Sequence, residues 1–168
     1  MEQFKISIIG NPGVGKTQIL KTLCGKTISE EYGQNIASKE LYLGKKKVQV
    51  TLWDLPAQQR FESVRKVYYK GSSTIIIVFD LTRRTTFTEL HKWVKEVANS
   101  LQYIPYIVFL GTKKNMVDFH EISEEEIQAI SKKFDIDYFL VSANNADELE
   151  KMFITHLTRY TQLLNEKK

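Results

Sequence analysis

The sequence is poor in the residues that mark disulfide-rich, membrane-spanning or linker-containing chains. Of its 168 residues one is cysteine and three are proline, which excludes a disulfide framework and a proline-rich linker. The longest apolar run, Thr74 to Phe79, is too short to cross a bilayer and suits a strand buried on both faces. Cys24 falls on the apolar side of an expected helix, where packing is favoured over redox chemistry. We therefore expect a reducing, cytoplasmic setting.

Charge of either sign is moderate. The formal net charge is +4, and the lysines are spread along the chain apart from residues 45–47 and the last two. Residues 45–47 follow Gly44 between two strand patterns, where a solvated hairpin turn is favoured over a nucleic-acid patch. We expect no nucleic-acid partner. With 42% hydrophobic residues, the chain suits one domain, residues 1–168, with a buried core.

What the sequence does contain is a complete phosphate-binding loop. Residues 10–17 read Gly-Asn-Pro-Gly-Val-Gly-Lys-Thr and match G-x-x-x-x-G-K-[ST] between a strand pattern and a helix pattern. The glycines let backbone N–H groups surround a polyphosphate, Lys16 reaches the β and γ phosphates, and the Thr17 hydroxyl can ligate Mg²⁺. An ordinary glycine turn is the weaker interpretation. We expect the chain to bind a nucleoside triphosphate.

Strand and helix patterns alternate along the whole chain. Strands are expected at residues 4–9, 41–43, 48–53, 75–79, 106–110 and 138–141. Helices are expected at residues 18–24 and 61–70, after the capping boxes Thr86-x-x-Glu89 and Ser123-x-x-Glu126, and over 149–160. This alternation predicts an α/β fold with a mostly parallel sheet, helices on both faces, and ligands above the carboxyl ends of the strands.

Two further residues extend the phosphate site. Asp54 ends the strand at 48–53, and a lone aspartate there would be an ordinary surface residue. Together with Lys16 and Thr17, its carboxylate is better explained as holding a water on Mg²⁺. Gln58 follows four residues later, where it can orient a water in line with the γ-phosphate. We predict Gln58 and Lys16 as the catalytic residues.

Four segments resemble the Ras superfamily of small GTPases, and its Rab branch in particular: residues 10–17, 53–61, 68–72 and 79–82. The resemblance extends from residue 4 to about 160. It implies a G domain of the P-loop NTPase class, with a six-stranded mostly parallel sheet and one antiparallel edge strand. It further implies binding of GTP or GDP with Mg²⁺ and two switch segments, near residues 28–37 and 54–69. The partners implied are effectors, exchange factors and GTPase-activating proteins.

The resemblance also assigns the site residue by residue. Nucleotide contacts are expected from Asn11, Pro12, Gly13, Val14, Gly15, Lys16, Thr17, Gln18, Ile28, Tyr32, Ala57, Thr112, Lys113, Asn115, Ser142, Ala143 and Asn144. The Mg²⁺ ligands are expected to be Thr17, Asp54 and Asn35, with Gln34 and Ser38 as weaker alternatives to Asn35.

The base-reading motifs depart from the family pattern. The family's Asn-Lys-x-Asp is Thr-Lys-Lys-Asn here, at residues 112–115. An aspartate accepts hydrogen bonds from both guanine N1–H and the 2-amino group, whereas Asn115 offers one acceptor oxygen, and the lost contact typically costs ~1.5–3 kcal/mol. The family's Ser-Ala-Lys is Ser-Ala-Asn at residues 142–144, which keeps the Ala143 N–H and loses the lysine stem. We expect weaker discrimination for guanine.

The switch segments and the phosphate loop depart as well. Ile28 and Asn35 stand where the family has a base-clamping phenylalanine and a metal-ligating threonine. Ala57 replaces the pivot glycine of switch II, so its N–H remains but the freedom at positive φ is lost. Pro12 has no N–H to offer a phosphate.

Three functions remain open at this stage. The first is a slow guanine-nucleotide switch, because the phosphate-site side chains are present. The second is a pseudoGTPase, an interaction module with weak or no turnover, which the departures at Asn35, Ala57 and Asn115 favour. The third is a P-loop hydrolase or kinase acting on another base. A kinase usually adds an arginine-rich lid, and only Arg83 and Arg84, expected to be solvated in a turn, come close.

The end of the chain bears on membrane attachment. The Rab-like family normally ends in a prenylated cysteine, whereas this sequence ends Leu-Asn-Glu-Lys-Lys at residues 164–168. We expect no membrane contact by this chain itself, and membrane association only through a lipidated tail that this sequence lacks.

Overall fold

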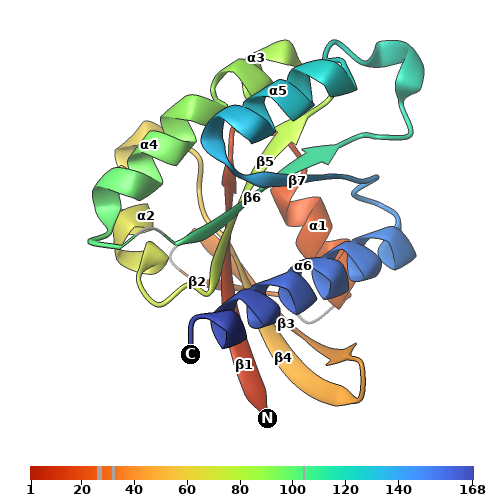
Figure 1. Ribbon diagram of the computed structural model, residues 1–168. Helices are drawn as coiled ribbons and strands as arrows, with labels where there is room; N and C mark the ends of the chain where they lie inside the picture. The colour runs from red at the N-terminus through yellow and green to blue at the C-terminus, as the bar shows by residue number, and fades with distance from the viewer. Residues whose placement is uncertain (26–27, 32, 104) are drawn as a thin grey trace.

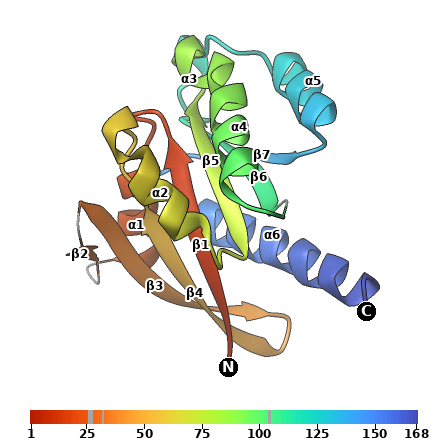
Figure 2. The ribbon, with the colours of Figure 1, turned by 90° about the vertical axis from the view of Figure 1, so that its left-hand side faces the viewer.

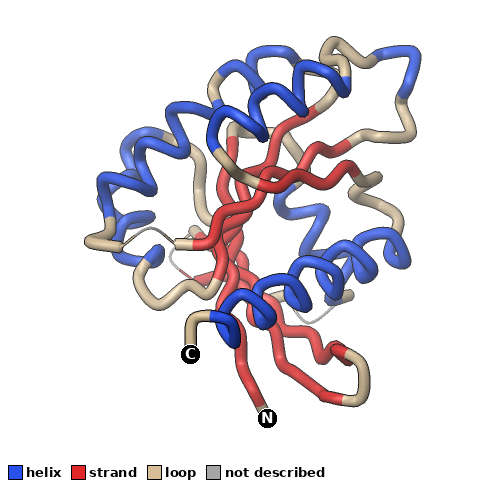
Figure 3. Tube along the Cα trace, viewed as in Figure 1, coloured by secondary structure: helices blue, strands red, loops and turns tan. Residues whose placement is uncertain are grey.

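The structure, a computed structural model, describes residues 1–25, 28–31, 33–103 and 105–168. A seven-stranded sheet runs through the middle of the molecule and helices cover both of its faces (Figures 1 and 3). The strand order is β2-β3-β4-β1-β5-β6-β7. All neighbours pair in parallel except β2 with β3 and β3 with β4. The expected α/β class and mostly parallel sheet are confirmed.

The elements follow the expected alternation. The strands are β1 (Glu2–Gly10), β2 (Ser29–Glu31), β3 (Gln34–Leu43), β4 (Lys46–Asp54), β5 (Thr74–Asp80), β6 (Tyr106–Thr112) and β7 (Asp137–Leu140). The α-helices are α1 (Lys16–Cys24), α2 (Glu62–Tyr69), α3 (Arg84–Thr88), α4 (Leu90–Ser100), α5 (Glu124–Phe134) and α6 (Ala146–Glu166). Two short 3₁₀ turns are η1 (Gln59–Phe61) and η2 (Val117–Phe119).

Each face of the sheet has its own hydrophobic core. On one face, α1 and α6 pack over residues such as Ile6 and Val78. On the other face, α2, α4 and α5 pack over residues that alternate with these along the strands, such as Ile77 and Phe79. The arrangement is visible in Figure 2, where α2 and α4 lie on the side of the sheet away from α6. Because the central strands are covered twice, the polar groups that could bind a ligand gather in the loops at the strand ends.

The antiparallel edge of the sheet is larger than expected. The sequence predicted six strands, one of them a short antiparallel strand at residues 41–43, whereas β3 begins at Gln34 and a three-residue strand, β2, pairs with its first residues. Asn35 therefore lies opposite Asp54 in the β3–β4 ladder. The polar composition of residues 29–38 gave no apolar alternation from which these strands could be predicted.

One of the two predicted capping boxes is confirmed and the other is wrong. Ser123 and Glu126 form the reciprocal bonds of a capping box at the start of α5. Thr86 lies inside α3, where its hydroxyl accepts from Asp80 N–H and donates to the Arg83 carbonyl, each across 2.8 Å. The Glu89 carboxylate accepts a hydrogen bond from the Asn11 side chain, and α4 begins without a side-chain cap.

Over the described residues, none of the helices combines the length and the apolar character that crossing a bilayer requires.

Candidate nucleotide and metal site

The phosphate loop lies between β1 and α1, as its motif predicted. Gly10 has a φ of 145°, and a Cβ added there would lie 2.3 Å from the Val78 carbonyl oxygen, so only glycine fits. Gly15, with a φ of 109°, ends the loop at the start of α1. The loop thus ends at a helix N-terminus, the arrangement that favours an anion.

Lys16 is held inside the loop. Its ammonium donates to the carbonyl oxygens of Gly10 and Asn11 across 2.9 and 3.0 Å. Burial lowers the pKa of Lys16 to about 8, although the Asp54 carboxylate acts in the opposite direction. Among the described residues, the hydrogen bonds that this buried ammonium makes go to neutral carbonyls, which an anionic ligand could replace.

The three predicted metal ligands meet at one point. The Thr17 hydroxyl donates to Asp54 Oδ2 across 2.6 Å, and the Asn35 amide donates to the same oxygen across 3.1 Å. Asp54 is 5% exposed at the end of β4. Hydroxyl, carboxylate and amide groups supply the oxygen donors that Mg²⁺ prefers, with room for waters in its shell. The residues present therefore fit a magnesium ion.

A cavity of about 470 Å³ opens beside these groups. Most of the predicted phosphate and switch residues line it: Pro12, Gly13, Gly15, Lys16, Thr17, Gln18, Asn35, Asp54, Ala57 and Gln58. Gly33, Leu55, Pro56 and Phe61 complete the wall. Gln58 is exposed and precedes η1, so its side chain is free to approach a ligand in the cavity.

Asn11 faces away from this cavity. Its side-chain oxygen accepts from the Trp93 indole N–H across 2.8 Å, and its amide nitrogen donates to Glu89 across 2.7 Å. The phosphate loop is thereby fastened to α4. The sequence predicted a nucleotide contact for Asn11 and gave no indication of Trp93 or Glu89, because residues 78 and 82 positions away carry no local signal.

Thr112 supports the phosphate loop from the opposite side. It is 1% exposed, and its hydroxyl lies 2.7 Å from the Val14 carbonyl oxygen and 3.1 Å from that of Phe79. A Cβ on Gly15 would lie 3.6 Å from both Thr112 and Ala143. The two base-facing loops therefore adjoin the phosphate loop, and the Thr112 side chain contacts protein rather than open space.

Lys113 is held by a buried carboxylate. Its ammonium lies 2.7 Å from Asp80 Oδ2, and Asp80 is fully buried at the end of β5. Burial alone would raise the pKa of Asp80, but hydrogen bonds from Lys113 and Thr82 lower it below its usual value. Lys113 has a φ of 63°, so the loop turns sharply there and leaves Asn115 exposed.

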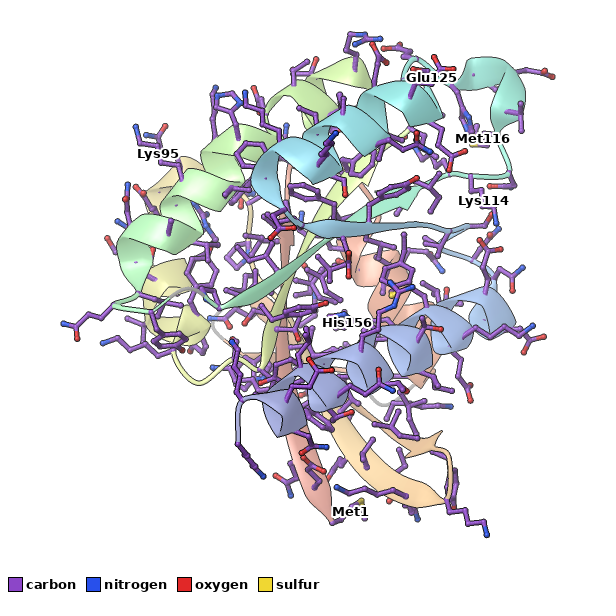
Figure 4. The ribbon with its side chains drawn as sticks, in the orientation of Figure 1. Met1, Lys95, Lys114, Met116, Glu125 and His156 are labelled. Carbon is purple, nitrogen blue, oxygen red and sulfur yellow. The ribbon has the colours of Figure 1, made fainter. Side chains whose placement is uncertain are left out.

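The loops after β6 and β7 lie against each other. Lys114 N–H donates to the Val141 carbonyl across 3.1 Å, and the Lys114 ammonium lies 3.4 Å from Glu148. Figure 4 shows Lys114 and Met116 in the loop beyond β6. Glu148 also accepts from Ser142 N–H, while Asn144 is exposed.

The remaining predicted nucleotide contacts include Ile28, Gln18 and Tyr32. Ile28 packs against the core of the α1 and α6 face. The Gln18 amide, at the edge of the cavity, donates to the Thr22 hydroxyl across 2.9 Å. Tyr32 lies outside the described residues.

Comparison with known proteins agrees with this geometry. The model of the Ras family matches residues 5–162. "Ras-related protein Rab2BV" of Beta vulgaris is 30% identical over 98% of this chain and 78% of its own length. "Ras-related protein Rab11C" of Lotus japonicus shows the same three values, and "GTP-binding protein ypt3" of Schizosaccharomyces pombe is 27% identical over the same shares.

The fold and the family match together define a G domain of the P-loop class. The chain belongs to the Ras family and is a Rab-like small GTPase. The resemblance on which the sequence analysis relied is confirmed.

Proposed function

We propose that the chain binds GTP and GDP with Mg²⁺, hydrolyses GTP slowly and acts as a molecular switch. The observation that carries the proposal is the convergence of Lys16, Thr17, Asp54 and Gln58 on one cavity. All four have the chemistry that phosphoryl transfer requires of a protein, which is to position groups and stabilise charge.

Each residue of the site has a separate role, which follows from its position. Lys16 exchanges its carbonyl partners for the β and γ phosphate oxygens and neutralises part of their charge. The backbone N–H groups of residues 13–17 bind the remaining oxygens at the start of α1. Thr17 and Asp54, with Asn35, hold Mg²⁺, which when bound neutralises charge on the phosphates.

Gln58 orients the water that attacks the γ-phosphate. Its amide can accept a hydrogen bond from a water and donate one to a phosphate oxygen, which orients the water for in-line attack. The Ala57 N–H beside it can bind the γ-phosphate. An arginine provided by a partner is worth roughly 10³–10⁵ in rate in this reaction class, so turnover without a partner is slow.

Family membership supports the choice of base and partners. The loops at residues 112–115 and 142–144 adjoin the phosphate loop, where a base attached to the bound phosphates would lie. We propose that the chain's partners are effectors, exchange factors and GTPase-activating proteins, and that it acts in vesicle trafficking.

The test is direct. Protein purified at low temperature is heat-denatured and the released nucleotide is identified by chromatography, where we expect GDP or GTP. A fluorescent guanine nucleotide is then titrated with Mg²⁺ and with EDTA, and against Lys16→Ala. We expect tight binding only for the wild-type chain with Mg²⁺. Equal affinity in all three titrations would refute the site.

A further inference from the structure

Arg65 is a buried arginine in switch II that the proposed chemistry does not use. It lies on α2 and is 3% exposed. Its Nη2 and Nε donate to the two carboxylate oxygens of Glu96 on α4 across 2.6 and 3.1 Å. The Tyr69 hydroxyl donates to the same carboxylate, and the guanidinium carbon lies 4.9 Å from the ring centre of Trp93. A two-pronged ion pair over an aromatic ring fixes the guanidinium firmly.

The remaining nitrogen of Arg65 holds the backbone of switch II. Its Nη1 donates to the carbonyl oxygens of Pro56 and Gln58 across 2.8 and 2.7 Å. These carbonyls flank Ala57. The Pro56 carbonyl and the Ala57 N–H belong to one peptide unit, and the described residues contain no cis peptide bond. In a trans peptide the N–H points opposite to the carbonyl, so the Ala57 N–H points away from Arg65.

Residues 56–58 separate Arg65 from the nucleotide cavity. All three line the 470 Å³ cavity, whereas Arg65 lines a second cavity of about 740 Å³ between α2 and α4. Figures 1 and 2 both show α2 beside α4. Ala57 lines both cavities, so the peptide that Arg65 holds forms part of the wall between them, and its N–H, on the side away from Arg65, faces the cavity proposed for the phosphates.

The anchor of Arg65 is shared with the phosphate loop. Trp93, whose ring lies under the guanidinium, donates its indole N–H to Asn11. One aromatic side chain on α4 thus contacts both the arginine that holds switch II and Asn11, the second residue of the phosphate loop. Both segments are therefore fastened to α4.

We infer that Arg65 is a positioning residue that holds the Ala57 N–H toward the γ-phosphate before any nucleotide binds. This inference rests on the proposed function. In this chain, Ala57 in place of glycine and Arg65 on the preceding carbonyl both oppose rotation of that peptide. A bound triphosphate would then accept a hydrogen bond from an Ala57 N–H that is already oriented. A diphosphate has no γ-phosphate to accept it.

The test compares triphosphate with diphosphate affinity in three variants. Arg65→Met keeps the length of the side chain and removes every donor, and Arg65→Lys keeps the charge. Arg60→Met is the matched control, because Arg60 lies in the same segment, is exposed, and contacts the ring of Phe61. GTP and GDP affinities, thermal midpoints and amide hydrogen exchange of residues 57–61 are measured for each with Mg²⁺.

We expect Arg65→Met to lower GTP affinity by about tenfold while GDP affinity stays nearly constant, with faster exchange at residues 57–61. Arg65→Lys should restore part of the loss, and Arg60→Met should match the wild type. If Arg65→Met lowers both affinities equally, Arg65 is merely structural and the inference is wrong. If that variant does not fold, Glu96→Gln is measured in its place. A lower ratio of GTP to GDP affinity supports the inference, and an unchanged ratio overturns it. A wild-type chain that binds neither nucleotide refutes the proposed function instead.

Discussion

Arg83 Nη1 donates a hydrogen bond to the carbonyl oxygen of Pro12 across 3.0 Å. A Cβ added to Gly13 would lie 3.1 Å from the same nitrogen, so the guanidinium lies directly against the phosphate loop. The Pro12 carbonyl shares a peptide unit with the Gly13 N–H, and a hydrogen bond to the one polarises the other as a donor. Pro12 itself has no N–H. Arg83 therefore strengthens the Gly13 N–H as a donor, next to Pro12, which has no N–H to donate.

We expect Arg83→Ala to weaken GTP binding by about three- to tenfold, the effect of one hydrogen bond from a charged group at an exposed position. Arg84→Ala is the matched control, because Arg84 is adjacent, is also exposed, and bonds to Glu121 and Glu126 instead. Affinities are measured by titration of a fluorescent nucleotide at two salt concentrations. Equal losses in the two variants would mean that only the net charge matters.

Local signals were enough to predict that the phosphate-loop residues and Asp54 lie together. The loop motif fixes the spacing from Gly10 to Thr17, and the apolar strand that ends at Asp54 delivers its carboxylate to the same edge of the sheet. Parallel pairing of β4 with β1 is enough to bring the two motifs together. Nothing beyond periodicity and strand direction is needed for this part of the site.

Contacts that depend on tertiary packing were not predictable in the same way. Arg65 and Glu96 are 31 residues apart on two helices whose sequences read as ordinary amphipathic patterns. Thr86 matched a capping box, but its hydroxyl is used by the end of β5, so a tertiary contact overrides the local preference. Long-range hydrogen bonds have no periodic signature, and they account for most of what the sequence left out.

We predict that the base preference depends on Asn115. Its amide can accept from N1–H and donate to a carbonyl, which matches xanthine better than guanine. We expect XTP to compete at least as well as GTP, and Asn115→Asp to tighten GTP by about 10- to 100-fold. Competition titrations of GTP, XTP and ATP measure this.

A matched control for Asn115→Asp is Asn165→Asp, which adds the same charge at the exposed end of α6. It should leave the order of the nucleotides unchanged. A wild-type chain that prefers GTP by several orders of magnitude would show that another group reads the guanine edge.

We predict that the proposed hydrolysis depends on Gln58. Replacing it by leucine removes both hydrogen-bonding groups and should slow single-turnover hydrolysis by about tenfold or more, with little change in affinity. Gln59→Leu is the control, since Gln59 is also exposed but lines the second cavity. Hydrolysis that is equally fast in all three chains would show that Gln58 is a surface residue.

His156 makes stability depend on pH. It lies between α6 and the sheet, 1% exposed, with Nε2 3.0 Å from the Thr74 hydroxyl and its ring stacked on Tyr106 (Figure 4). Burial lowers its pKa from 6.5 to about 4, with Asp137 raising and Arg159 further lowering it. Between these two values the unfolded chain binds more protons than the folded one, so stability falls as pH falls.

Lowering the pH from 7 to 5 should therefore cost about 2 kcal/mol through His156 alone. His156→Gln keeps a hydrogen-bonding group for Thr74 and removes the titration, so its free energy of unfolding should fall less over the same range. Urea unfolding of both chains at both pH values gives the difference, and carboxylates that titrate equally in the two chains cancel. Identical pH dependence would show that His156 becomes charged without penalty, through an opening of α6 that the folded structure does not show.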